Sequence, residues 1–226
     1  MSARAPAPAT AVVFDLDGTL VDSAPDICAV GNRVLAAEGA APLTLAEARR
    51  YVGSGADMFV RRMRVARGLP DAAHARMRAA FLDAYEGAVA RSALYPGVAD
   101  ALAVLAGHGH PMAVCTNKPI GPARAVLAHF GLAGRFGAVI GGDSLPERKP
   151  DPAPLRAAFA GLGAAGGLFV GDSEIDAETA ERAGVPFLLF TEGYRSAPAA
   201  TLPHAAAFAH FDALPGRVAE RVVRSA

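Results

Sequence analysis

The chain contains no tryptophan and only two cysteines, and its charges cancel. Cys28 and Cys115 are too few for a disulfide framework and lack metal-binding spacing, so we expect a cytoplasmic protein with reduced thiols. Lysine plus arginine equals aspartate plus glutamate at 22 each, which leaves no broad basic surface for nucleic acid or an anionic membrane. No apolar run reaches the ~18 residues that a membrane-spanning helix needs. These absences exclude disulfide-rich, nucleic-acid-binding and membrane-spanning classes.

The length and composition bound the number of domains. The 226 residues, 52% of them hydrophobic, suit one domain with a large insertion or two modest domains, at ~150 residues per domain. Residues 1–10 are rich in alanine and proline and lack the apolar centre of a secretory signal. We therefore expect a disordered leader over residues 1–10.

Short apolar runs alternate with helical patterns through the second half of the chain. This alternation predicts a doubly wound, Rossmann-like parallel sheet with helices on both faces, an α/β fold. Its first strand is residues 12–14. Further strands are expected at 112–115, 137–140, 168–170 and 186–190, and helices near 97–107, 122–130, 152–162, 174–183 and 214–224.

Residues 22–94 interrupt this alternation with helical patterns only. Asp22 or Ser23 can cap one helix, and Thr44 with Glu47 forms a capping-box pattern at the start of another. The sequence therefore predicts an all-helical domain at 22–94, inserted into an α/β core domain made of 11–21 and 95–226. Two connections between two compact bodies favour a cleft between them.

Polar side chains follow the expected strands at the points where they end. Asp15, Asp17 and Thr19 come directly after the first strand. The others are Thr116, Asn117, Lys149, Asp172 and Asp176. Ligands bind beyond the carboxyl ends of parallel strands, so we expect these side chains to meet. A polar turn would explain Asp15 and Asp17 alone, but two carboxylates at the mouth of a buried strand are costly without a cation or a reaction.

Four motifs in order, FDLDGTLVDS, CTN, RKPDP and GDSEIDAETAERAG, identify a family. In these segments, and over nearly the whole chain after the leader, the sequence resembles the haloacid dehalogenase superfamily of phosphotransferases with a helical cap. The resemblance implies that Asp15 is a nucleophile that forms an aspartyl-phosphate. It also implies that Asp17 is a general acid and base. Dehalogenating members lack this second aspartate, which favours a phosphatase or a phosphomutase.

The resemblance implies a Mg²⁺ cofactor and a phosphate site. Asp15, Asp172 and the backbone carbonyl of Asp17 would hold the ion, because Mg²⁺ prefers oxygen ligands. Asp176 would orient either that metal shell or the lysine. Lys149, the Thr116 hydroxyl and the Asn117 amide would bind phosphoryl oxygens, and Thr19 would belong to the turn that positions Asp17.

Substrate specificity is expected in the cap. Gly53, Ser54 and Gly55 offer backbone N–H groups to an anion, although an ordinary turn between helices is an alternative. This loop, the cap start and the segment TEGYR at 191–195 resemble the phosphoglycolate phosphatase branch. Four arginines could instead read a substrate carboxylate, but a solvated helix face is the simpler interpretation. They are Arg61, Arg62, Arg64 and Arg67.

The resemblance thus implies a small phosphate monoester as partner, with 2-phosphoglycolate favoured. It leaves open pyrophosphate, sugar phosphates, a mutase reaction, or a catalytically idle binding module. Neither nucleic acid nor a membrane is expected as partner, and a monomer or a homodimer is expected.

Overall fold

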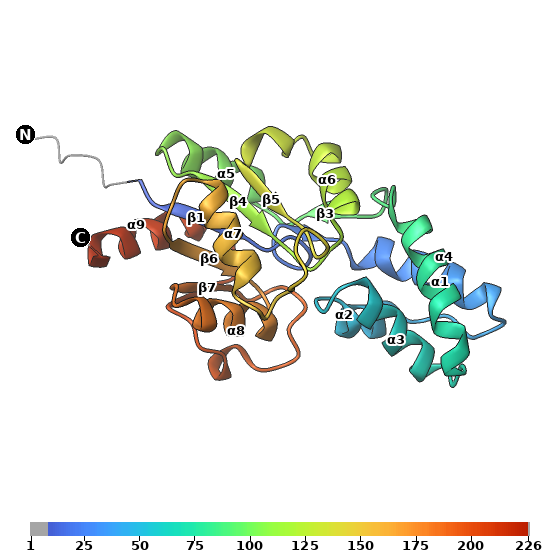
Figure 1. The fold of residues 1–226 in the computed structure, drawn as a ribbon. Coiled ribbons are helices and arrows are strands. Elements are labelled where there is room, and N and C mark those ends of the chain that lie inside the picture. Colours follow the sequence, from blue (N-terminus) through green and yellow to red (C-terminus); the bar gives the residue numbers. More distant parts are fainter. Residues whose placement is uncertain (1–8, 226) are drawn as a thin grey trace, which may run out of the picture.

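The computed structural model describes residues 9–225, with side chains up to 221. Its core is a six-stranded parallel sheet of order β5-β4-β1-β6-β7-β8 (Figure 1). Numbered along the chain, these strands follow the doubly wound order of a Rossmann fold, as predicted. Most of the expected disordered leader, residues 1–8, lies outside the described residues. The strands are β1 (Ala11–Phe14), β4 (Met112–Cys115), β5 (Ala138–Ile140), β6 (Gly167–Gly171), β7 (Phe187–Phe190) and β8 (Ala206–Phe208).

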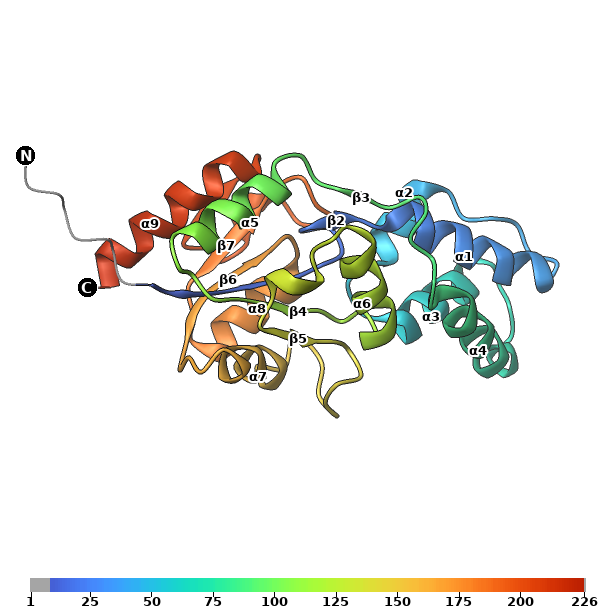
Figure 2. The ribbon, with the colours of Figure 1, turned by 90° about the horizontal axis from the view of Figure 1, so that it is seen from above.

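Both faces of the sheet are covered because its strands are apolar on both sides. Along β1, Val12 and Phe14 enter one hydrophobic cluster, whereas Ala11 and Val13 enter the other. The first cluster packs under α5 (Val98–Gly107), α6 (Ile120–His129) and α9 (Leu214–Ser225). The second packs under α7 (Ala153–Gly161) and α8 (Glu174–Ala183). Figure 2 shows α5 and α9 on one face and α7 and α8 on the other.

A group of helices, here called the helical module (residues 24–85), lies beyond the carboxyl ends of the strands (Figure 1). It has its own buried hydrophobic cluster, in which the ring centroids of Phe59 and Phe81 are 5.3 Å apart. Thr44 caps its second helix through the expected capping box with Glu47. Its helices are α1 (Ala24–Ala37), α2 (Leu45–Tyr51), α3 (Ala56–Ala66) and α4 (His74–Tyr85).

Two short strands connect the helical module to the sheet. The strands β2 (Val21–Asp22) and β3 (Ala93–Leu94) pair antiparallel, with Val21 opposite Leu94. The expectation of helices alone over 22–94 is therefore wrong at its two ends. A two-residue strand is too short to show alternation, so its pairing depends on the tertiary structure.

The last strand was not expected from the sequence. The segment that forms β8 reads HAAAFAH, in which alanines give no alternation. It pairs in parallel with β7, with Phe190 opposite Phe208. No helix within residues 9–225 has the length and apolar character needed to span a membrane. Single 3-10 turns lie at Asp71–Ala73, Ala133–Arg135, Ala199–Thr201 and Phe211–Ala213.

Candidate active site

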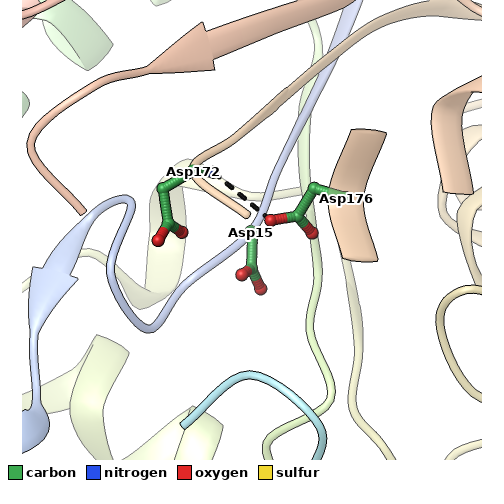
Figure 3. Close-up of side chains that lie close together, drawn as sticks. All are labelled: Asp15, Asp172 and Asp176. Atoms are coloured by element: carbon green, nitrogen blue, oxygen red, sulfur yellow. Dashed lines mark hydrogen bonds between the residues drawn. The ribbon is translucent and has the colours of Figure 1, made fainter. Parts of the chain in front are cut away.

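The site lies where the strand order reverses, between β1 and β6. These strands pair in parallel register, with Phe14 opposite Val170, so Asp15 and Asp172 leave the sheet side by side. The side chains of Asp15, Asp172 and Asp176 lie close together (Figure 3). Each offers an oxygen within 4.8 Å of the others, and all three residues are buried.

Lys149 neutralises part of this acidic cluster. Its ammonium lies 2.9 Å from Asp15 Oδ1 and 2.7 Å from Asp176 Oδ1. Burial opposes the charge of Lys149, but the two carboxylates outweigh burial and raise its pKa. Asp176 thus contacts the lysine, which is the geometry that one of its two predicted roles requires. Its other oxygen accepts hydrogen bonds from Asp172 N and Ser173 Oγ at the start of α8.

Burial raises the pKa of Asp15 to about 7, despite the opposing effect of Lys149. Burial, followed by the charges of Asp176 and Asp15, also raises the pKa of Asp172 well above its usual value. The site therefore holds more acidic groups than its cations can neutralise.

Asp172 differs from Asp15 and Asp176 in its partners. Thr19 Oγ1 donates to it at 2.8 Å and the backbone N–H of Tyr194 at 2.6 Å. Among the side chains that the structure describes, no lysine, arginine or histidine forms an ion pair with it. Thr19, predicted only to shape the turn, thus holds Asp172. A hard divalent cation bound by carboxylate oxygens fits this uncompensated charge.

Asp17 points toward a second lysine, which the sequence interpretation did not assign. Lys118 Nζ lies 3.0 Å from Asp17 Oδ1, and Ser23 Oγ donates to the same oxygen at 2.5 Å. Lys118 also donates to the hydroxyl of Tyr85 on α4. The adjacency of Lys118 to the CTN motif was a usable signal, but the contact with Tyr85 exists only in the folded chain.

Thr116 and Asn117 follow β4. Together with Asp15 and Asp17 they line a small cavity. The Thr116 hydroxyl accepts from Lys118 N at 3.2 Å and keeps its own hydrogen for a ligand. Asn117 Nδ2 donates to the carbonyls of Gly53 and Lys149, both at 3.0 Å. A phosphate contact through this amide would require one of these bonds to break, and the observed bonds tie the helical module to the sheet.

The loop between α2 and α3 closes over the acidic cluster. Gly53 and Gly55 have φ angles of 106° and 87°, a backbone conformation that favours glycine. Gly53 and Ser54 line a cavity of about 270 Å³ together with Asp15 and Asp172. Gly55 lines the smaller compartment beside Asp17. The three loop residues predicted to select the substrate therefore all face the site.

The interpretation of four arginines as a solvated helix face is wrong for two of them. Arg64 is 6% exposed, donates to Leu69 O at 2.8 Å and pairs with Asp71. The side chain of Arg67 is 14% exposed and is bound by both oxygens of Glu47. Arg61 is exposed as expected, and Arg62 lines the large cavity. Arg50, which was not predicted, also lines that cavity.

Comparison with known proteins shows the family and agrees with the fold. The model of the haloacid dehalogenase-like hydrolases matches residues 12–190, and the chain belongs to this family. It is 53% identical to a phosphoglycolate phosphatase of Cereibacter sphaeroides strain ATCC 17029, over 90% of this chain and 95% of that protein. It is 50% identical to a phosphoglycolate phosphatase of Rhodobacter capsulatus, over 93% of this chain and 97% of that protein. The fold matches the crystal structure of a predicted phosphoglycolate phosphatase from Haemophilus somnus 129PT. That match has a TM-score of 0.87 and 31% identity, covering 92% of this chain and 97% of the other.

Proposed function

We propose that the protein is a Mg²⁺-dependent phosphatase that hydrolyses 2-phosphoglycolate to glycolate and inorganic phosphate. Relatives named phosphoglycolate phosphatase that match over nine-tenths of the chain support the substrate. The observation that carries the reaction is the buried contact of Asp15 with Lys149, beside the uncompensated carboxylate of Asp172.

In the first step, an Asp15 carboxylate oxygen attacks phosphorus and the bond to the glycolate oxygen breaks. The Asp17 carboxyl gives its proton to that leaving oxygen. A carboxylate approaching a phosphate dianion meets a repulsion of about 4 kcal/mol per pair of unit charges at 4 Å. Lys149 and the Thr116 hydroxyl reduce this cost at the phosphoryl oxygens.

In the second step, water attacks phosphorus and the bond between phosphorus and Asp15 breaks. Asp17 takes the proton from that water, so both carboxyl groups return to their starting states. Asp15, Asp172 and the backbone carbonyl of Asp17 would hold Mg²⁺, which supplies positive charge against the phosphate.

We further propose that the chain divides into a cap domain, residues 22–94, and a core domain, residues 11–21 and 95–226. The separate hydrophobic cluster of the helical module and its two short connecting strands support this division. Gly53, Ser54 and Gly55 would then cover the substrate when the cap closes, and closure would exclude bulk water from the aspartyl-phosphate.

The substrate is tested with a panel that compares kcat/KM for 2-phosphoglycolate, pyrophosphate, hexose phosphates and nucleoside monophosphates. We expect 2-phosphoglycolate to have the highest kcat/KM of the panel. A clear preference for another ester would overturn the proposed substrate. A chelator should remove the activity, and added Mg²⁺ should restore it.

The nucleophile is tested by trapping. A beryllium fluoride adduct, or phosphate left after acid quenching, should map to Asp15. Substitution Asp15→Asn should remove both the adduct and the turnover. An adduct on any other side chain would refute the assignment.

A further inference from the structure

A second buried lysine, Lys118, lies in the site, and the proposed reaction steps do not use it. Lys118 Nζ lies 3.0 Å and 3.4 Å from the two oxygens of Asp17, and its side chain is 1% exposed. It also stands 4.3 Å from the centre of the Tyr85 ring and donates to its hydroxyl. Burying a charge has a cost even when it is paired, so a ligand that uses this charge would account for its place.

We propose that Lys118, together with Tyr85, binds the carboxylate of the substrate and so selects 2-phosphoglycolate among phosphate monoesters. This inference rests on the proposed function and names the residues that recognise the acid group. Lys118 lies in the loop that follows β4 of the sheet and Tyr85 in the helical module, so this binding site is complete only while the two are in contact.

The position of Lys118 follows from the shape of the substrate. One methylene group separates the ester oxygen of 2-phosphoglycolate from its carboxylate carbon. Asp17 donates to that ester oxygen and must lie at about 2.6–3.2 Å from it. A cation bonded to Asp17 therefore stands within reach of the substrate carboxylate, and Lys118 is that cation.

The surrounding compartment suits a small acid. It is a space of about 30 Å³ between Asp15, Asp17 and the helical module. Its polar lining is concentrated around Asp17 and Lys118, and an anion among its apolar walls requires a cation and donors. The apolar lining includes Ile27, Phe59 and Phe81.

Tyr85 supplies the second donor. Its hydroxyl accepts from Lys118 and keeps its own hydrogen for a carboxylate oxygen. Burial, with the charges of Asp17 and Asp26, holds the pKa of Tyr85 far above its usual value, so the phenol stays neutral. An ammonium and a phenol together match the two oxygens of one carboxylate.

Two arginines of the helical module are the rival candidates for this role. Arg50 and Arg62 line the larger cavity of about 270 Å³ next to Asp172. Arg62 already donates to Tyr51 O at 2.9 Å, and Arg50 is exposed. Lys118 is the one of these three cations that is bonded to Asp17. Substitution of Arg50 therefore tests the rival assignment.

The test compares kcat/KM for 2-phosphoglycolate and for ethyl phosphate, in which a methyl group replaces the carboxylate. The ratio of the two values measures recognition of the acid group. It should fall by about 100-fold or more in Lys118→Gln, because a buried charge contact is lost. It should fall by about 10-fold in Tyr85→Phe, which removes one oxygen, and stay within about 3-fold in Arg50→Gln.

A binding measurement separates recognition from turnover. In the Asp15→Asn background, calorimetry should show that Lys118→Gln weakens binding of 2-phosphoglycolate far more than binding of ethyl phosphate. Equal losses for the two ligands would mean that Lys118 acts only on Asp17, and would overturn the inference. A collapse of the ratio in Arg50→Gln instead would assign the carboxylate to the cap arginine.

Failure of the proposed function is visible before any substitution. A wild-type enzyme that does not prefer 2-phosphoglycolate over ethyl phosphate would refute both the proposed function and this inference. Circular dichroism checks that each variant is folded. If Lys118→Gln does not fold, the kcat/KM ratio of Tyr85→Phe tests the inference instead, because this substitution removes a single oxygen from the same compartment.

Discussion

The backbone N–H of Tyr194 donates a 2.6 Å hydrogen bond to Asp172 Oδ2. The hydroxyl of the same residue donates to Asp22 Oδ1 at 2.5 Å and accepts from Ala24 N at 2.9 Å. Tyr194 therefore connects the carboxylate proposed to bind Mg²⁺ with the strand that enters the helical module. The segment 191–195 was noted in the sequence only as a family resemblance, and this contact gives it a physical role.

Gly193 should be essential for metal binding because Asp172 packs directly against it. A Cβ atom at this position would lie 2.3 Å from the Cβ and Oδ2 atoms of Asp172. The substitution Gly193→Ala should displace the carboxylate and weaken Mg²⁺ binding by about 10- to 100-fold. Titration of the enzyme with Mg²⁺, followed by calorimetry and by activity, measures this.

Gly107→Ala is the matched control for this prediction. Gly107 ends α5, and nothing lies within 4 Å of a Cβ placed there. Its Mg²⁺ affinity should equal that of the wild type, and its stability should be equal or slightly higher. An unchanged affinity in Gly193→Ala would show that Asp172 is not held by this contact.

Asp15 should lower the stability of the metal-free protein at neutral pH. Its folded pKa of about 7 lies above the unfolded value of 3.8, so the folded state binds the proton more tightly. The stability linked to Asp15 is complete below pH 4 and is lost as the pH rises through 7. Asp15→Asn removes this loss and should raise Tm at pH 8 by about 2–4 °C for each kcal/mol recovered.

The measurement is thermal unfolding in the presence of a chelator, at pH 5 and at pH 8. The gain in Tm should be larger at pH 8 than at pH 5. Saturating Mg²⁺ should reduce the gain, because the ion stabilises only the folded wild-type site. Equal Tm values for wild type and variant at pH 8 would contradict the raised pKa.

The strand-end acids can be located from the sequence because local pattern and strand polarity suffice for them. Asp15 and Asp172 had to meet once β1 and β6 were neighbours. The contacts of Lys118 with Tyr85, and of Tyr194 with Asp22, join residues that are far apart in the chain. Nothing in the local pattern of either partner indicates such pairs.

The same distinction applies to the fold. Strands with bulky apolar runs, such as β4 and β7, were predicted within a residue of their observed bounds. The alanine-rich β8 was missed because its alanines give no alternation, and its place is set by pairing with β7, where Phe190 packs against Phe208. The short pair of β2 and β3 was missed because two residues show no periodicity.

Arg64 should be a structural residue, although it lies on a helix with exposed arginines. It is buried, and it holds Leu69 O and Asp71 at the end of α3. Arg64→Ala should lower the free energy of unfolding by about 1–3 kcal/mol. Arg61→Ala on the same helix should change it by less than about 0.5 kcal/mol. Urea unfolding measures both, and equal effects would restore the solvated-face interpretation.

Asn117 should affect substrate affinity through the contact between the helical module and the sheet. Its amide is the donor to Gly53 O, 3.0 Å away across the site. Asn117→Ala removes this bond, and closure over the substrate becomes less favourable by about 0.5–1.5 kcal/mol. We expect KM for 2-phosphoglycolate to rise by about 3- to 10-fold. Steady-state kinetics measure this.

Asn32 gives the matched control, because it makes a comparable bridge inside the helical module. It donates to Leu43 O at 3.1 Å and accepts from Leu43 N at 2.6 Å. Asn32→Ala should lower Tm while leaving KM unchanged, since its bonds do not cross the site. If Asn117→Ala lowered Tm in the same way and left KM unchanged, the hydrogen bond to Gly53 would have no part in closure. The loop at 53–55 would then close by packing alone.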